Sequence, residues 1–379
     1  MKNDTSKKAI ALHKKLGGKI RIAPAAPIKS RADMSLVYTP GVAAVSSLVA
    51  KNPKLARDYT IKGKMIAVIS DGSAVLGLGN IGALGALPVM EGKAALFKAF
   101  ANVDAFPIVL DTQNVDEIVE TIIRIAPAFG GINLEDFAAP NCFEIEDRVK
   151  AALDIPVMHD DQHGTAIAVL AALMNASKVV GKKFNNLKVV VAGAGAAGTA
   201  VTKLLVKAGV KDVIVLDRKG TLSKDRSDLN GHKAELVKMT NPRNVNGSLQ
   251  DALTGADVVL GVSGPGLMTA ADVKLMAQKA IVFAMANPTP EIMPEEAKKG
   301  GAAVIGTGRS DYPNQINNSL VFPGVFRGAL DNRVTKITDD MKLKAAKNLA
   351  SLVKKPTADK IVPGPFDKGV VQAVAKAIK

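Results

Sequence analysis

Short apolar runs alternate with helix-like segments along almost the entire chain. Runs such as Met65–Ser70, Gly131–Leu134 and Leu187–Ala192 have the length of buried strands. Segments long enough for helices separate them, and this order is typical of βαβ units in a mostly parallel sheet. At 379 residues the chain exceeds the usual size of a single hydrophobic core. We therefore expect an α/β protein with two domains.

The alternation restarts after a polar, turn-rich stretch at residues 181–186. Before it, strands are expected at 65–70, 105–110, 131–134 and 155–158, with helices at about 91–100, 116–125, 142–153 and 164–180. After it, strands are expected at 187–192, 213–216, 258–262, 281–284 and 303–305. The sequence thus predicts an N-terminal α/β domain over 1–161. A second domain over 162–379 combines a doubly wound parallel sheet of the Rossmann type with a C-terminal helical segment.

Composition excludes several classes of protein. The formal net charge of +15 would suit an anionic partner, but no run of five basic residues occurs and aromatic residues make up 4%, which leaves few platforms for stacking bases. No uninterrupted apolar stretch reaches the roughly 18 to 20 residues that span a bilayer, and the charged N-terminus lacks the layout of a secretory signal. The single cysteine, Cys142, precludes an intramolecular disulfide and is assigned to the core. We expect a cytoplasmic protein that binds neither nucleic acid nor membrane.

A glycine-rich loop directly follows the expected strand at 187–192. It comprises Gly193, Ala194, Gly195, Ala196, Ala197 and Gly198, and an apolar helix over about 199–208 comes next. Gly193 permits a tight turn, Gly195 lets the backbone approach a pyrophosphate, and Gly198 allows close packing of helix on strand. Asp217 ends the following strand, where it can accept hydrogen bonds from an adenosine ribose. The pattern predicts a dinucleotide site formed by these loop residues and Asp217.

The identity of the dinucleotide depends on the residues around Asp217. Its carboxylate favours a free ribose 2′-hydroxyl and hence NAD, whereas Arg218 and Lys219 could meet the 2′-phosphate of NADP. A second glycine loop at Gly77–Gly82 does not directly follow its strand and has no acidic partner at the expected distance. We interpret it as a backbone loop that approaches either the substrate or the facing domain.

Two acidic pairs stand at the expected carboxyl ends of strands. Glu135 and Asp136 follow the strand at 131–134, and Asp160 and Asp161 follow the strand at 155–158. That rim of a parallel sheet is where ligands bind, so distant pairs can converge there. Carboxylate oxygens suit a hard cation such as Mg²⁺ or Mn²⁺. A solvated loop or the start of a helix explains either pair equally well.

Two further side chains carry possible proton chemistry. Lys93 lies in an apolar segment that is expected to begin a helix, and burial would lower its pKa toward the range of a general base. A lysine at the start of a helix is more often exposed. Tyr38 precedes a turn and could donate a proton, although a tyrosine packed in the core is the default.

Together these segments resemble the malic enzymes, in particular their short bacterial and archaeal form. The similarity runs through almost the whole chain and includes Val37–Gly41, Ser70–Gly82, Met90–Lys93, Asn133–Phe137, His159–Thr165, the Gly193 loop, Ala286–Thr289 and Gln315–Asn318. The resemblance implies oxidative decarboxylation of L-malate to pyruvate and CO₂, with NAD or NADP as oxidant and a divalent metal such as Mg²⁺ or Mn²⁺.

The resemblance also assigns roles to individual residues. Glu135, Asp136 and Asp161 match the metal ligands, and Lys93 matches the general base that Asp160 orients. Tyr38 matches the general acid that protonates the enolate. Asn287 and Asn318 match substrate-contacting asparagines, and Asn287 also borders the cofactor. Larger members of the family carry an arginine where this chain has Ala74, so Ser73 is added to the expected substrate contacts.

The resemblance further implies an oligomer. We expect a homodimer or a tetramer, with Tyr38 and Lys93 supplied by different chains. Three alternative functions stay open at this point: a malate-to-lactate converting enzyme, another two-domain dehydrogenase, and a non-enzymatic basic scaffold that binds nucleotides.

Overall fold

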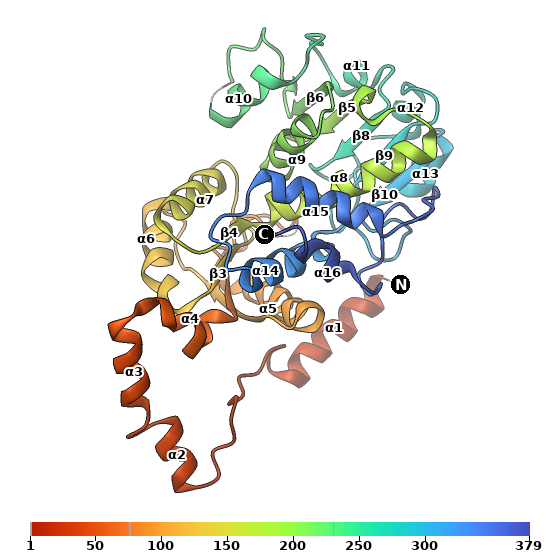
Figure 1. Ribbon diagram of the computed structural model, residues 1–379. Coiled ribbons are helices and arrows are strands. Elements are labelled where there is room, and N and C mark those ends of the chain that lie inside the picture. Colours follow the sequence, from red (N-terminus) through yellow and green to blue (C-terminus); the bar gives the residue numbers. More distant parts are fainter. Residues whose placement is uncertain (1, 76, 230) are drawn as a thin grey trace.

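Two sheets, each covered by helices, form the body of the protein; the first is parallel throughout, and the second is parallel except for one short antiparallel edge strand (Figure 1). The computed structural model describes residues 2–75, 77–229 and 231–379. This arrangement confirms the α/β class and the Rossmann-type second sheet that the sequence predicts.

The first sheet has the strand order β2-β1-β3-β4, and all neighbours in it are parallel. Its strands are β1 (Met65–Ser70), β2 (Asp104–Val109), β3 (Gly131–Leu134) and β4 (Val157–His159), and its helices are α5 (Gly82–Ala101), α6 (Val115–Ile125) and α7 (Asn141–Ala152). Pro107 lies in β2, which is an edge strand of the sheet. An edge strand has a neighbour on one side only, so it tolerates a residue that lacks a backbone N–H.

The second sheet has the order β10-β9-β8-β5-β6-β7. Its strands are β5 (Lys188–Ala192), β6 (Asp212–Asp217), β7 (Gly220–Thr221), β8 (Val258–Gly261), β9 (Ile281–Ala284) and β10 (Val304–Thr307), and its helices are α9 (Ala196–Lys207), α10 (Gly231–Met239), α11 (Leu249–Leu253), α12 (Ala270–Lys274) and α13 (Pro294–Lys299). The chain leaves β5 toward β6 on one side and later returns to β8 on the other. This reversal creates the crevice in which doubly wound sheets bind ligands.

Helix α8 (Asp160–Val180) joins the two sheets and is largely buried. Three C-terminal helices, α14 (Phe322–Asp331), α15 (Asp339–Ser351) and α16 (Val370–Ala375), return to the middle of the molecule, where α15 contacts α8 and α14 contacts α5 (Figure 1). The buried ring of Phe97 on α5 packs edge-on against Phe322 and Phe326, with centroids 4.7 and 5.5 Å away. The C-terminal helices therefore share one core with the first sheet.

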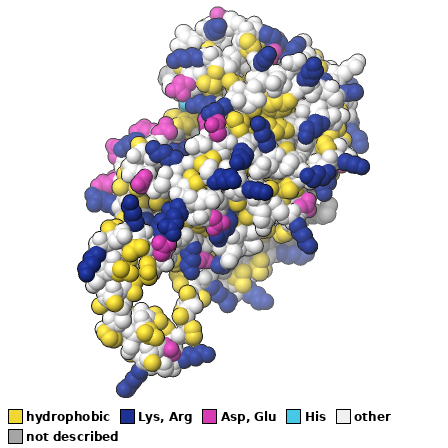
Figure 2. Space-filling view, viewed as in Figure 1, with side chains coloured by type: hydrophobic (Ala, Val, Ile, Leu, Met, Phe, Trp, Pro, Cys, Tyr) yellow, Lys and Arg dark blue, Asp and Glu magenta, His cyan; other side chains and the backbone are white. Residues whose placement is uncertain are grey.

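The N-terminal segment lies outside this body. It contains α1 (Lys2–Leu16), α2 (Arg31–Val37), α3 (Val42–Lys51) and α4 (Ala56–Tyr59), and Figure 1 shows α2 and α3 projecting from the rest of the molecule. We call residues 19–51 the arm. Apolar side chains of the arm are exposed, among them Ile22 and Leu36, and they gather at the lower left of Figure 2.

Short 3₁₀ helices complete the secondary structure at Pro53–Leu55, Ile61–Gly63, Ala126–Ala128, Phe184–Asn186 and Asn318–Leu320. Two segments, Arg31–Lys51 and Asp160–Val180, are long and apolar enough to resemble membrane spans. The second is the core helix α8, and the first is divided into α2 and α3, so this resemblance is weak support for a membrane span.

The sequence places most strands within one or two residues but misjudges the starts of three helices, since α8 begins at Asp160 rather than near residue 164. Helix α5 begins at Gly82 rather than near residue 91, because its first turns contain glycines and Pro88, which are poor helix formers. Lys93 therefore lies in the middle of a helix, and the expectation that it begins one is wrong. Helix α9 begins within the glycine loop, at Ala196 rather than Thr199.

Replacing Phe326 by alanine should destabilise the protein, because it empties a fully buried site that joins α14 to Phe97 on α5. We expect a loss of about 3–5 kcal/mol in the free energy of unfolding, measured by urea denaturation. Phe366→Ala is the matched control, since its ring is 86% exposed and its loss should cost less than about 0.5 kcal/mol. Equal effects of the two substitutions would contradict the shared core.

Candidate active site

The carboxyl ends of three neighbouring strands bring acidic side chains to one rim of the first sheet. Asp71 follows β1, Glu135 and Asp136 follow β3, and Asp160 and Asp161 follow β4. The last two also form the first turn of α8, where the helix dipole favours negative charge. All but Asp161 are buried, so the rim concentrates carboxylates away from water.

Three of these carboxylates lie close enough to share a cation. One oxygen from each of Glu135, Asp136 and Asp161 lies within 4.8 Å of the others. The backbone N–H of Asp136 donates to Asp161 Oδ2 at 2.8 Å, and Asn133 Nδ2 donates to Glu135 Oε2 at 3.0 Å. Asp136 has a φ of +57°, a left-handed conformation that aspartate tolerates better than most residues and that is frequent at functional sites.

Lys93 enters the same cluster from α5. Its side chain is buried, its Nζ lies 2.9 Å from Glu135 Oε1, and it also donates to Asp160 Oδ2. The ring of Phe322 lies beneath the ammonium group, with its centroid 4.3 Å from Nζ. Two carboxylates and one aromatic face therefore hold this amine in a fixed position.

The charges of the cluster do not balance. Burial works to lower the pKa of Lys93, but the neighbouring carboxylates of Asp160, Glu135 and Asp161 outweigh it and raise that pKa above its usual value. The expectation that burial lowers the pKa of Lys93 is therefore wrong when only the protein side chains of the cluster are considered. Burial also raises the pKa of Glu135 and of Asp160, while the charge of Lys93 opposes both shifts.

A divalent cation fits this arrangement. Glu135, Asp136, Asp160 and Asp161 set four carboxylates against the single ammonium group of Lys93 in a largely buried volume. Such an excess of buried negative charge is costly unless a cation compensates it. An all-oxygen donor set suits Mg²⁺ or Mn²⁺ rather than a soft metal.

The expected substrate contacts lie around this cluster. The Ser73 hydroxyl donates to Asp71 Oδ1 at 2.6 Å and accepts from the N–H of Ala138 at 2.9 Å, so it fastens the loop after β1 to the loop after β3. Asn318 borders Asp160: a Cβ added to Gly164 would lie 3.1 Å from the Asn318 Cβ and 1.8 Å from Asp160 Oδ1. Glycine at 164 therefore leaves the space that the Asp160 carboxylate occupies and lets Asn318 approach α8.

Asn287 reaches the first sheet from the other domain. It follows β9, and a Cβ added to Gly77, which has a φ of +73°, would lie 2.2 Å from the Asn287 carbonyl oxygen. The second glycine loop thus contacts the facing domain, which is one of the two roles that the sequence analysis gives it.

Tyr38 does not join the cluster within one chain. It ends α2, its side chain is 68% exposed, and Figure 1 shows α2 well separated from α5 and β3. Among Tyr38, Lys93 and Asp160, the residues expected to be catalytic, Tyr38 is therefore the one that does not lie at the acidic cluster of its own chain.

The glycine loop Gly193–Gly198 borders a cleft of about 1190 Å³ at the carboxyl ends of β5, β6 and β8. A Cβ on Gly198 would lie 1.8 Å from the Gly193 carbonyl oxygen, whereas a Cβ on Gly195 would meet open space. Gly198 therefore serves packing, and Gly195 leaves room for a ligand. Ala196 and Ala197 form the first turn of α9, whose N–H groups face this end of the sheet.

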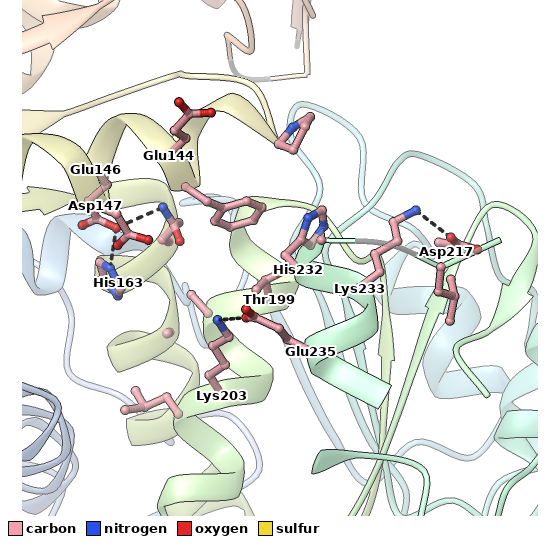
Figure 3. Close-up of a pocket in the computed structure, with 18 of the residues that line it drawn as sticks. Glu144, Glu146, Asp147, His163, Thr199, Lys203, Asp217, His232, Lys233 and Glu235 are labelled. Atoms are coloured by element: carbon pink, nitrogen blue, oxygen red, sulfur yellow. Dashed lines mark hydrogen bonds and ion pairs between the residues drawn. The ribbon is translucent and has the colours of Figure 1, made fainter. Parts of the chain in front are cut away.

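Asp217, at the end of β6, already has partners. Arg226 Nη1 donates to its Oδ1 at 2.7 Å, and Lys233 Nζ donates to its Oδ2 at 2.6 Å. Burial works to raise the pKa of Asp217, but these hydrogen bonds and that of the Lys219 N–H together lower it to about 2. Figure 3 shows Lys233 pointing at Asp217.

Sequence reasoning misses Glu146, a buried carboxylate on α7. It accepts from the backbone N–H of His159 at 2.9 Å and from Gln162 Nε2 at 3.2 Å, and it lies 2.9 Å from His163 Nε2 (Figure 3). It thereby fixes the turn that carries Asp160 and Asp161. The sequence does carry a signal for Glu146, because it stands four residues after Cys142 and so lies on the same apolar face of the helix. Cys142 itself is buried, and burial raises the pKa of its thiol to about 12.

Two family profiles cover most of the chain. Residues 17–150 match "Malic enzyme, N-terminal domain", and residues 162–376 match "Malic enzyme, NAD binding domain". The chain is 55% identical over 365 residues to an NAD-dependent malic enzyme of Geobacillus stearothermophilus, covering 96% of this chain and 76% of the relative. It is 54% identical over 373 residues to a bifunctional malic/malolactic enzyme of Bacillus subtilis, covering 98% and 91%.

Solved structures agree with this similarity. The crystal structure of an NAD-dependent malic enzyme from Thermotoga maritima superposes with a TM-score of 0.95 at 48% identity, and the match covers 98% of each chain. On the strength of both profiles, these relatives and this superposition, the chain belongs to the malic enzyme family.

Proposed function

We propose that Lys93 and the four carboxylates around it perform the reaction of this family, the oxidative decarboxylation of L-malate to pyruvate and CO₂ with NAD or NADP as oxidant. The observation that carries the proposal is the burial of the Lys93 amine between Asp160 and Glu135, beside three carboxylates that suit one cation. A mere structural ion pair would need one carboxylate, not four.

Each residue has a role in this proposal. Glu135, Asp136 and Asp161 would hold Mg²⁺ or Mn²⁺, which would supply Lewis acidity at the malate hydroxyl and carboxylate, and NAD(P)⁺ in the cleft of the glycine loop would supply the hydride acceptor. Lys93 Nζ removes the hydroxyl proton, and Asp160 holds Nζ in position.

Lys93 must be neutral to accept that proton. The carboxylates that raise its pKa include the proposed cation ligands Glu135 and Asp161. Compensation of their charge would remove part of what raises the pKa of Lys93, so that burial, which lowers it, would count for more.

The remaining contacts orient the substrate. Asn318, which lies near Gly164 in the first turns of α8, and Asn287, whose backbone contacts the Gly77 loop, would bind malate through their amides. With Ala74 in place of the family's arginine, recognition of the second carboxylate falls to these amides and to the loop that Ser73 fastens.

Protonation of the enolate at C3 is assigned to Tyr38, and this requires a second copy of the chain. Tyr38 is exposed at the end of α2, and the arm around it carries exposed Ile22, Leu36 and Val37. An apolar surface of this kind favours an interface between protein chains. We propose a homodimer in which the arm brings Tyr38 to the Lys93 cluster of the partner.

Conversion of malate to lactate is a second candidate activity, favoured by the 54% identity to the bifunctional Bacillus subtilis protein. The two reactions differ in their products. Pyruvate release accumulates NADH or NADPH at an absorbance of 340 nm, whereas lactate formation consumes the hydride again and leaves no net reduced cofactor.

Replacing Lys93 by alanine should lower kcat for malate oxidation by about 10²- to 10⁴-fold, because the proton acceptor is lost. Steady-state kinetics with malate, Mn²⁺ and each cofactor measure the effect. Lys98→Ala is the control on the same helix, since its exposed ammonium pairs with Asp104 instead. A Lys93→Ala enzyme with near-normal kcat would exclude the assigned role.

Removal of divalent cations with EDTA should abolish malate oxidation, and added Mn²⁺ or Mg²⁺ should restore it, because four carboxylates, three of them buried, otherwise face one ammonium group. Glu135→Gln should weaken Mn²⁺ binding about 10-fold or more in a calorimetric titration, since one charged ligand is lost. The exposed Glu144, which pairs with Arg148, provides the control Glu144→Gln. Full activity in EDTA would point to another two-domain dehydrogenase.

Mixing inactive subunits tests whether Tyr38 and Lys93 come from different chains. Equal amounts of Tyr38→Phe and Lys93→Ala protein, dissociated and reassembled, should regain about a quarter of wild-type activity, because half the dimers are mixed and each mixed dimer has one intact site. No recovery, with mixed dimers demonstrated by differently tagged chains, would place both groups in one chain.

A further inference from the structure

The end of the dinucleotide cleft near β6 has an unusual charge arrangement. Arg218, Lys219, Arg226 and Lys233 surround the carboxylates of Asp217 and Asp228, which leaves two formal positive charges in excess. A site that reads the neutral 2′-hydroxyl of NAD needs an available carboxylate and no excess of cations.

The Asp217 carboxylate is saturated with donors. Its Oδ1 accepts from the N–H of Lys219 at 2.9 Å and from Arg226 Nη1 at 2.7 Å, and its Oδ2 accepts from Arg226 Nη2 at 3.2 Å and from Lys233 Nζ at 2.6 Å. A carboxylate offers about four lone-pair positions, and these four bonds fill them. A ribose hydroxyl must therefore displace one of these charge-assisted bonds before Asp217 can bind it.

The same two cations suit a phosphate group. Arg226 presents a planar fork of N–H donors that matches phosphate oxygens, and Lys233 adds a mobile ammonium group. Arg226 is also held by Asp228, with Nη2 2.9 Å from Oδ2, so the guanidinium keeps one anchor when a ligand draws it from Asp217. The Asp217 charge, which would repel a phosphate, is neutralised in advance by these partners.

There is space beside this cluster. A second cavity, of about 830 Å³, lies between α7, α8, α9 and α10 and shares Asp217, Lys219, His232 and Lys233 with the cleft. Figure 3 shows Lys233 and Asp217 at one end of it. A group attached to the ribose therefore has space beyond Asp217, in this second cavity.

From this arrangement we infer that Arg226 and Lys233 form a binding site for the 2′-phosphate of NADP. They determine the cofactor specificity of the chain, and Asp217 keeps them in place until the phosphate arrives. The inference rests on the proposed function, because it assumes that the dinucleotide binds in the cleft beside the glycine loop. It moves the expected preference from NAD toward NADP.

The test compares two fragments that differ by this phosphate, 5′-AMP and 2′,5′-ADP, in calorimetric titrations of the full-length protein. The wild-type protein should bind 2′,5′-ADP about tenfold or more tightly than 5′-AMP, because charge-assisted bonds to the extra phosphate are gained. Arg226→Ala and Lys233→Ala should each remove most of this difference, while 5′-AMP binding stays equal or improves as Asp217 becomes available.

Lys203→Ala is the matched control, because Lys203 lines the same cavity but pairs with Glu235. It should leave the ratio of the two affinities unchanged. The kinetic counterpart is a fall in kcat/KM for NADP⁺ relative to NAD⁺ in the Arg226 and Lys233 variants.

Equal affinity of the wild-type protein for both fragments, or a preference for 2′,5′-ADP that survives both substitutions, would overturn the inference. The titrations involve no turnover. A protein that binds 2′,5′-ADP as described but does not oxidise malate would refute the proposed function and leave this site standing.

Discussion

The confinement of four carboxylates and one ammonium group in a largely buried volume is the feature on which the rest of the structure depends. The cluster is assembled by β-strand order, because β1, β3 and β4 end side by side, and by α5, which brings Lys93 to the same rim. Around it, uncharged groups hold two of its members: the Asn133 amide donates to Glu135, and the backbone N–H of Asp136 donates to Asp161. This order is what a site needs when a small displacement of a reacting group is costly.

Much of this could be predicted from the sequence, for identifiable reasons. Strands such as β3 and β9 are short apolar runs between turn residues, and their bounds follow directly. The glycine loop stands directly after a strand, so its position was also predictable. The acidic pairs were predictable as occupants of the rim but not as a cluster, because periodicity gives no strand order.

Other parts depend on contacts that no local pattern encodes. The first turns of α5 could not be recognised as helical from the sequence, because they contain glycines and Pro88, which have low helix propensity. Packing against the rest of the core overrides this propensity. The pairing of Asp217 with Arg226 joins residues across an aperiodic loop, so the charge of the cofactor cleft could not be inferred from Asp217 by itself. The raised pKa of Lys93 likewise depends on carboxylates that come from other elements.

The ring under Lys93 belongs to Phe322, on a helix that lies near the end of the chain. All strands of both sheets, the last of which is β10, are therefore synthesised before the ring that lies under the amine. A chain that ended before α14 would keep the acidic residues of the rim but lack this ring and the packing of α14 on α5. The amine site is therefore complete only after the segment that follows both sheets has been synthesised.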